Sequence, residues 1–131
     1  MFYTMKQVCK QTNLTYDTLK FYCNEGLVPN VQRDKNNRRI FRERDIEWIK
    51  SLLCLKNCGF SIAEMRQYVK LCKQGKTSIS ERQKMLNEKL SNLHHNLKEL
   101  EKSINYIHKK QQFYQDVLAG RRKYYSNLTD S

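Results

Sequence analysis

The most reactive side chains in this sequence are five cysteines, all of which lie among the first 72 of its 131 residues. They are Cys9, Cys23, Cys54, Cys58 and Cys72. No two are spaced as Cys-x-x-Cys, and the three histidines lie between residues 94 and 108, far along the chain from every cysteine. A structural zinc site needs such spacings, so none is expected. An odd number of cysteines in a chain that we expect in the cytoplasm predicts free thiols rather than a disulfide framework.

A second group of functional side chains is a cluster of arginines and lysines between residues 33 and 44. Six of these twelve residues are basic, and only Asp34 and Glu43 are acidic. The whole sequence carries a formal net charge of +12. A positive surface attracts polyanions, and clustered guanidinium groups suit contacts with the phosphates of nucleic acid. A solvated basic loop has the same composition, so the flanking elements must distinguish the two.

Other chemistry has little support in the sequence. No paired carboxylates, nucleophile–base set or phosphate-binding loop stands out, so we predict neither an enzyme nor a bound cofactor or metal. No apolar run approaches the roughly 18 residues of a membrane-spanning helix, and the first residues do not resemble a signal peptide. We therefore expect a cytoplasmic protein without a membrane partner.

A short helix is predicted just before the basic cluster, over residues 15–25. Thr15 suits the N-cap position, and Asp17 places a negative charge at the positive end of the helix dipole. Gly26 suits the left-handed residue that ends a helix, and Pro29 prevents its continuation. Such a helix can read DNA, or it can be an ordinary packed helix.

The elements on either side of this helix favour the DNA-reading role. Thr4 and Gln7 fit a capping box that opens a preceding helix to about residue 12, and Asn13 suits a tight turn, which together predict a helix-turn-helix. Residues 31–41 predict two short strands around an Asn-Asn turn, a small β-wing. Two more helices are predicted at about 43–74, the second opened by a capping box of Ser61 and Glu64. We assign residues 1–75 to a winged helix-turn-helix domain.

The longest pattern in the chain is a seven-residue repeat of apolar side chains over residues 78–119. Its members are the residues that we expect at a dimer interface: Leu86, Leu90, Leu93, Leu97, Leu100, Ile104, Ile107, Tyr114 and Leu118. Ser78 and Glu81 fit a capping box at its start. A helix of this length is about 60 Å long, and its own small domain cannot cover the apolar seam, so coiled-coil self-association is expected. Residues 120–131 form a basic, aromatic tail that either covers a pocket on the partner subunit or frays.

These motifs, in this order, resemble those of the MerR family of bacterial transcription regulators. The matching segments are residues 14–22, 25–29, 33–41 and 54–62, which together with the heptad helix account for most of the chain. The resemblance implies a mainly α fold: a winged helix-turn-helix DNA-binding domain with a small β-wing, plus a long C-terminal helix that forms an antiparallel coiled-coil dimer.

The resemblance also implies a function. Members of the family bind a pseudo-palindromic promoter as homodimers and distort the DNA so that RNA polymerase can engage both promoter elements. Carried over, it implies base-edge contacts from Thr15, Tyr16, Asp17 and Thr18, and contacts to the DNA backbone from Lys20, Tyr22, Arg33 and Arg39, with Arg38 beside them. The charge of Asp17 at a helix N-terminus is an equal alternative to a base contact. Lys20, Phe21 and Cys23 depart from the usual Arg, Tyr and acidic residue, which leaves the operator sequence open but not DNA binding.

The segment around Cys54 is similar to the branch of the family that responds to aldehydes and other electrophiles through one thiol on the third helix. Lys50 and Lys56 lie near Cys54 in sequence and would favour its thiolate if either side chain approached. A cysteine that packs as a small apolar residue is the alternative. Cys58 is a less favoured candidate, because residues four apart on an intact helix are too distant for a disulfide.

Three functions stay open on the sequence alone. The first is a promoter-distorting activator that responds to a small electrophile through Cys54. The second is a regulator of the same family that binds a small ligand without a covalent bond. The third is an effector-free architectural or adaptor protein whose coiled coil recruits a partner.

Overall fold

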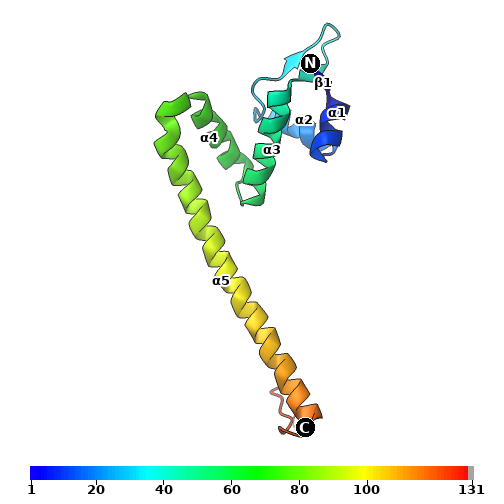
Figure 1. The fold of residues 1–131 in the computed structure, drawn as a ribbon, viewed down its shortest axis with the longest axis vertical. Helices are drawn as coiled ribbons and strands as arrows, with labels where there is room; N and C mark the ends of the chain where they lie inside the picture. The colour runs from blue at the N-terminus through cyan, green and yellow to red at the C-terminus, as the bar shows by residue number, and fades with distance from the viewer. Residues whose placement is uncertain (130–131) are drawn as a thin grey trace. The chain divides into compact units, whose positions relative to one another are not determined.

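The computed structural model describes residues 1–129, which contain three short strands and six helical segments (Figure 1). The strands are β1 (Tyr3–Thr4), β2 (Gln32–Arg33) and β3 (Arg39–Phe41). The helices are α1 (Met5–Thr12), α2 (Tyr16–Asn24), α3 (Glu43–Asn57), α4 (Ile62–Lys73), the 3-10 helix η1 (Gly75–Ser78) and α5 (Ile79–Leu118). The predicted helix-turn-helix, wing and long C-terminal helix are confirmed. The chain divides into two compact units, one spanning Met1–Lys89 and one that begins at Leu90.

The core of the first unit is built from apolar side chains that recur at helical spacing. Ile46, Ile49 and Leu52 lie on one face of α3 and are completely buried. Around them pack buried side chains from the other elements: Val8 of α1, Leu19 of α2, Phe41 of β3, and Met65 and Val69 of α4. The central helix α3 therefore fixes the positions of α1, α2 and the wing.

The wing is a three-stranded antiparallel sheet with the order β1-β3-β2, rather than the predicted hairpin alone. Gln32 pairs with Ile40 and Arg33 with Arg39, as expected for the hairpin. The additional strand β1 pairs with β3, placing Tyr3 opposite Phe41 and Thr4 opposite Ile40. Two residues show no alternation of apolar and polar side chains, so β1 carries no sequence signal. Its pairing ties the start of α1 directly to the wing.

Helix termini follow the predicted capping boxes in two of three cases. Thr4 accepts from the Gln7 amide while Gln7 accepts from the Thr4 amide, and Ser61 and Glu64 do the same at α4. The prediction for Ser78 is wrong. Its hydroxyl is buried and bonds to the carbonyls of Leu71 and Gly75, because the chain passes through η1 before α5 starts. Ser78 therefore joins α4 to α5 instead of capping α5.

Helix α5 is 40 residues long and buries no side chain within the chain. The apolar residues of its heptad repeat remain exposed, for example Leu93 at 40%, Leu97 at 53% and Ile107 at 56%. Soluble subunits rarely leave a continuous apolar stripe of this length uncovered. None of the helices that the structure describes is both long and apolar enough to cross a bilayer.

The start of α5 packs on the first unit, which runs to Lys89. Met85 contacts the core, and Lys89 donates to the carbonyl of Gly59 at 3.2 Å and pairs with Glu64 at 2.8 Å. The Lys89 ammonium also lies 5.5 Å from the centre of the Phe60 ring. These contacts join the first turns of α5 to the α3–α4 corner.

The Lys89–Glu64 pair predicts a pH-dependent contribution to stability. The hydrogen bond from Lys89 lowers the pKa of Glu64 below its ordinary value of 4.5. A carboxyl whose pKa is lowered on folding stabilises the fold above that ordinary value, and the contribution is lost as the pH falls through the folded pKa. We expect Lys89→Met to destabilise the protein near neutral pH and the difference from wild type to shrink below pH 4.5. Urea unfolding over this pH range measures it, and an equal difference at every pH would contradict the assignment.

Candidate nucleic-acid interface

Helix α2 is held at the surface by contacts at both ends and along its inner face. The Thr15 hydroxyl caps its start by accepting from the Thr18 amide at 3.2 Å, and Leu19 anchors its inner face in the core. At its end, Gly26 takes a φ of +75° and the Leu27 amide donates to the Tyr22 carbonyl at 3.0 Å. This is the bond of a Schellman stop. Trp48 then donates its indole N–H to the Leu27 carbonyl at 2.8 Å, fixing the segment after the helix.

The outer face of α2 carries the residues predicted to contact bases and the DNA backbone. Thr15, Tyr16, Asp17 and Lys20 are exposed, and Thr18 is half-buried. The Thr15 hydroxyl donates to the Thr18 hydroxyl at 2.9 Å, which leaves the Thr18 hydroxyl proton available to another acceptor. Phe21, which is 41% exposed, adds an apolar edge beside them. The face thus combines hydroxyl groups, a carboxylate and an ammonium group.

Tyr22 lies elsewhere. Its side chain is 3% exposed and packs in the core, so its ring offers no surface to a DNA backbone. Its hydroxyl is buried without a hydrogen-bond partner within the described part of the chain. The helical period explains the difference, because Tyr22 is three residues from the buried Leu19 and shares its face. We therefore interpret Tyr22 as a core residue.

A tyrosine-to-phenylalanine exchange tests this interpretation of Tyr22. A buried hydroxyl without a partner costs about 1–3 kcal/mol of desolvation, so its removal is not destabilising. We expect Tyr22→Phe to leave the free energy of unfolding unchanged or to raise it by up to about 1 kcal/mol, with operator affinity within about twofold of wild type. Denaturant unfolding and a DNA-binding titration measure both quantities. A clear loss of operator affinity at an unchanged free energy of unfolding would show that Tyr22 contacts the DNA backbone after all.

The wing turn is ordered by Asp34. Its carboxylate oxygen Oδ1 accepts from the amides of Asn36 at 2.9 Å and Arg38 at 3.0 Å, and Asn37 takes the left-handed conformation with a φ of +60°. Asparagine tolerates this conformation better than most residues. The turn therefore presents Arg38 in a fixed backbone conformation with its side chain exposed.

Two wing arginines make internal contacts that orient them. The Arg33 guanidinium donates to the Asn37 carbonyl at 2.8 Å, across the base of the turn. The Arg39 guanidinium donates to the side-chain carbonyl of Asn24 at 2.6 Å. Because Asn24 is the last residue of α2, the second bond ties the wing to the reading helix. Each arginine retains further N–H donors for an anion.

A hollow of about 440 Å³ lies where α1, α2 and the wing meet, and we call it the wing hollow. It brings together three predicted cations and one that the sequence analysis missed: Arg33, Arg38, Arg39 and Lys6. Asp34 also lines it, but one of its oxygens already accepts two amide hydrogens. Four cations around a hollow give it the positive charge that suits the phosphates of a nucleic acid backbone. Lys6 was missed because its place depends on β1, which carries no signal.

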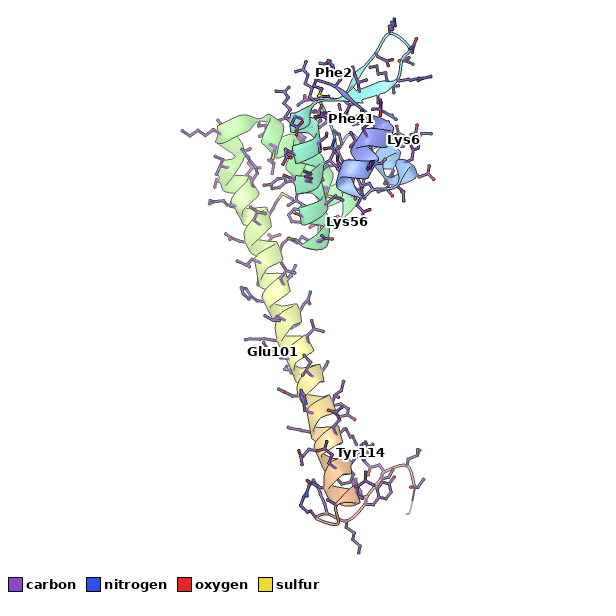
Figure 2. All side chains as sticks on the ribbon, turned by 45° about the vertical axis from the view of Figure 1, so that its right-hand side comes forward. Phe2, Lys6, Phe41, Lys56, Glu101 and Tyr114 are labelled. Atoms are coloured by element: carbon purple, nitrogen blue, oxygen red, sulfur yellow. The ribbon has the colours of Figure 1, made fainter. Side chains whose placement is uncertain are left out.

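Figure 2 labels two cations of the first unit, Lys6 and Lys56. Lys6 lies on α1 beside the wing, whereas Lys56 lies near the opposite end of α3. Tyr16 lines the wing hollow at the start of α2, while Thr15, Asp17, Thr18 and Lys20 lie outside it. The predicted contact residues thus separate into a cationic hollow and a neighbouring helix face.

The cysteines are all free thiols, and they differ in exposure. Cys54 is exposed on α3, rather than packed in the core, and Cys58 is half-buried against it. Burial raises the pKa of the Cys9, Cys23 and Cys72 thiols, which makes those three less reactive. Lys50 pairs with Glu47 at 3.3 Å. Among the described residues, no group of three or more His, Cys, Asp or Glu side chains is placed to hold a metal ion.

A helix-turn-helix, a three-stranded wing and a cationic hollow between them define a winged helix-turn-helix DNA-binding protein. The chain belongs to the MerR family of helix-turn-helix regulatory proteins: the model of the MerR HTH family regulatory protein matches residues 3–72, and the MerR DNA-binding model matches residues 46–109.

Relatives agree with this assignment. An HTH-type transcriptional regulator of Haemophilus influenzae is 32% identical over 119 residues, which is 91% of this chain and 88% of that protein. The regulator AdhR of Bacillus subtilis is 38% identical over 61% of this chain and 57% of its own length. The crystal structure of HiNmlR, a MerR family regulator lacking the sensor domain and bound to promoter DNA, superposes with a TM-score of 0.77 at 32% identity, covering 91% of this chain and 94% of that one.

Proposed function

We propose that this regulator binds a pseudo-palindromic promoter as a homodimer, with one α2 and one wing at each half-site. The wing hollow carries this proposal, because four cations converge beside the exposed start of α2. The hollow would take backbone phosphates while Thr15, Tyr16, Asp17 and Thr18 meet base edges in the major groove. Lys20 would add a backbone contact. HiNmlR, which was solved bound to promoter DNA, supports promoter DNA as the partner.

The exposed apolar stripe of α5 would form the dimer interface, and we call this stripe the seam. Its members are the nine predicted residues Leu86, Leu90, Leu93, Leu97, Leu100, Ile104, Ile107, Tyr114 and Leu118, each at least 40% exposed in the single chain. A second copy packed antiparallel would cover the seam by knobs-into-holes contacts. A two-fold dimer matches a two-fold promoter site.

Such a dimer would activate transcription by deforming DNA. Many phosphate contacts at both ends of the site would supply the energy to bend and untwist the segment between them. RNA polymerase would then engage promoter elements that are too far apart in relaxed DNA. This role places the protein in the cytoplasm with the promoter.

Cys54 is the candidate sensor, as its exposure supports. A small aldehyde can reach the exposed thiol, and the sulfur would add to the carbonyl carbon while the thiol proton passes to the carbonyl oxygen. One C–S bond forms and the C=O bond becomes C–OH, so no other reactant is needed. The adduct would enlarge the side chain on α3 near the α3–α4 corner. Cys58 is less accessible, since it packs against the core.

Transcription from the native promoter tests the sensor. We expect formaldehyde or methylglyoxal to induce wild type and Cys58→Ser, and we expect Cys54→Ser to lose at least about 80% of the induction because only the exposed thiol reacts readily. Operator binding without inducer should be the same in all three proteins. Full induction in Cys54→Ser would remove the thiol from the proposal and favour a non-covalent ligand instead.

A further inference from the structure

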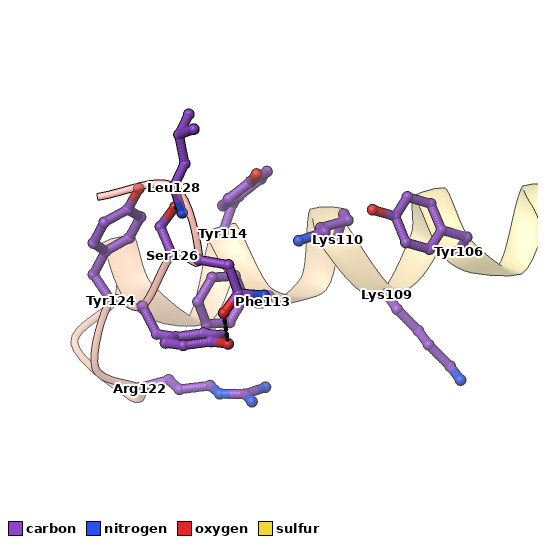
Figure 3. A pocket seen from close by; sticks show the side chains of 11 residues that line it. Tyr106, Lys109, Lys110, Phe113, Tyr114, Arg122, Tyr124, Ser126 and Leu128 are labelled. Carbon is purple, nitrogen blue, oxygen red and sulfur yellow. Dashed lines mark hydrogen bonds between the residues drawn. The ribbon is translucent and has the colours of Figure 1, made fainter. Parts of the chain in front are cut away.

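A second hollow lies in the second unit, between the end of α5 and the tail that follows it (Figure 3). We call it the tail hollow. Its volume is about 510 Å³, within the roughly 300–1,000 Å³ typical of sites for small organic ligands. Residues 106–114 of α5 form one wall, and residues 122–128 form the other. Its lining has no part in the DNA interface and shares one residue, Tyr114, with the seam.

The tail is held in place by a compact set of bonds at the end of α5. Gly120 takes a φ of +76°, and the Arg121 amide donates to the Asp116 carbonyl at 2.8 Å, which turns the chain back along the helix. The Arg121 guanidinium donates twice to the Asp116 carboxylate, at 3.1 and 2.9 Å, and Gln112 donates to the same oxygen at 2.9 Å. These bonds lower the pKa of Asp116, so its charge stays paired with Arg121. The turn brings residues 122–128 back beside α5, and the paired Asp116 is not among the residues that line the hollow.

Cations and aromatic rings line the tail hollow together. Lys109, Lys110 and Arg122 contribute positive charge, and none of the lining residues within the described chain is acidic. The Arg122 guanidinium lies 4.8 Å from the centre of the Phe113 ring, and the Lys110 ammonium lies 5.9 Å from that of Tyr106. Cation–π contacts at these distances help hold flexible cations in position. Three more rings belong to these two walls, those of Tyr114, Tyr124 and Tyr125.

We propose that the tail hollow binds a small organic anion with an aromatic body. Three cations with no opposing acid favour a carboxylate, and the rings favour a flat apolar group that can stack on them. A free inorganic anion would leave the aromatic walls uncovered, and a neutral aromatic would leave the cations without a partner. This site depends neither on promoter binding nor on the chemistry of Cys54.

Calorimetry with the full chain tests the proposal, using 2-naphthoate as the anionic probe and 2-naphthalenemethanol as its neutral counterpart. We expect 2-naphthoate to bind with a Kd of about 0.1–1 mM, as suits a ligand of this size, and the alcohol to bind at least about tenfold more weakly. Absence of 2-naphthoate binding at millimolar concentration would overturn the proposal. This outcome is also the one expected if a second copy of the chain fills the hollow.

Two variants localise the site. Lys110→Gln with Arg122→Gln should lower the affinity for 2-naphthoate at least about tenfold. Lys109→Gln with Lys110→Gln keeps the Arg122–Phe113 contact and should lower the affinity at least about threefold. The matched control is Lys84→Gln with Lys98→Gln, two exposed lysines of α5 outside the hollow, which should bind like wild type. Circular dichroism checks the helix content of all three proteins. Equal affinities in the control and in both site variants would overturn the proposal.

Discussion

Leu93→Glu combined with Leu97→Glu is expected to convert the protein from a dimer to a monomer and to lower operator affinity at least about 100-fold. In a dimer, binding of one α2 to its half-site raises the effective concentration of the other α2 at the second half-site, and a monomer lacks this gain. Both leucines lie in the seam, and they are 40% and 53% exposed in the single chain. Two carboxylates in each helix would be buried against the partner without counter-charges, which opposes association strongly. Sedimentation at micromolar concentration and a DNA-binding titration measure the two effects.

The folding of each subunit should survive this change. Neither leucine belongs to the core of the first unit, which ends at Lys89, and glutamate is a good helix former. Lys84→Gln with Lys98→Gln lowers the net charge by the same amount at positions outside the heptad seam, and this control should remain dimeric. A dimer of undiminished stability in the double-glutamate variant would show that the seam is not the interface.

The second large effect is expected at the wing hollow, from Lys6→Gln combined with Arg38→Gln. Both side chains line the hollow, and neither makes one of the internal hydrogen bonds that orient Arg33 and Arg39. A dimer would lose about four phosphate contacts, so the slope of log K against log salt should become less steep by about 3.6. The same relation predicts an affinity loss of about 1,000-fold at about 0.15 M salt.

The control for this variant carries the same loss of charge on another part of the first unit. Lys56→Gln with Lys70→Gln neutralises exposed lysines near the end of α3 and on α4, far in sequence from the wing. We expect its salt slope to stay within about one unit of wild type. Equal slopes in the two double variants would mean that net charge, rather than the wing hollow, governs binding to the operator.

Local signals were sufficient to predict most of the first unit. Thr4, Thr15 and Ser61 cap the helices that they were expected to cap, and Asn13 and Asn37 take the left-handed turns that their positions suggested. These features depend on residues two to four positions apart, so a sequence reports them directly.

Features that depend on distant contacts were missed or mistaken. Strand β1 forms only because it pairs with β3, which is distant in sequence. That pairing brings the start of α1, with Lys6, to the wing hollow. Ser78 and Glu81 have the spacing of a capping box, but the Ser78 hydroxyl bonds to the carbonyl of Leu71, seven residues earlier. Tyr22 was grouped with its exposed neighbours, although its distance from Leu19 places it in the core. The tail hollow requires the turn at Gly120, and no local pattern shows that the tail returns along α5.

The bond between Arg39 and Asn24 has a consequence for attempts to redesign promoter choice. Because it joins a wing residue to the last residue of α2, exchanging α2 alone also changes a contact of the wing. A chimera that receives α2 from a relative without an amide at position 24 would leave the Arg39 guanidinium without this acceptor and free it to take another direction. New binding preferences should therefore be transplanted as a block that carries both α2 and the wing.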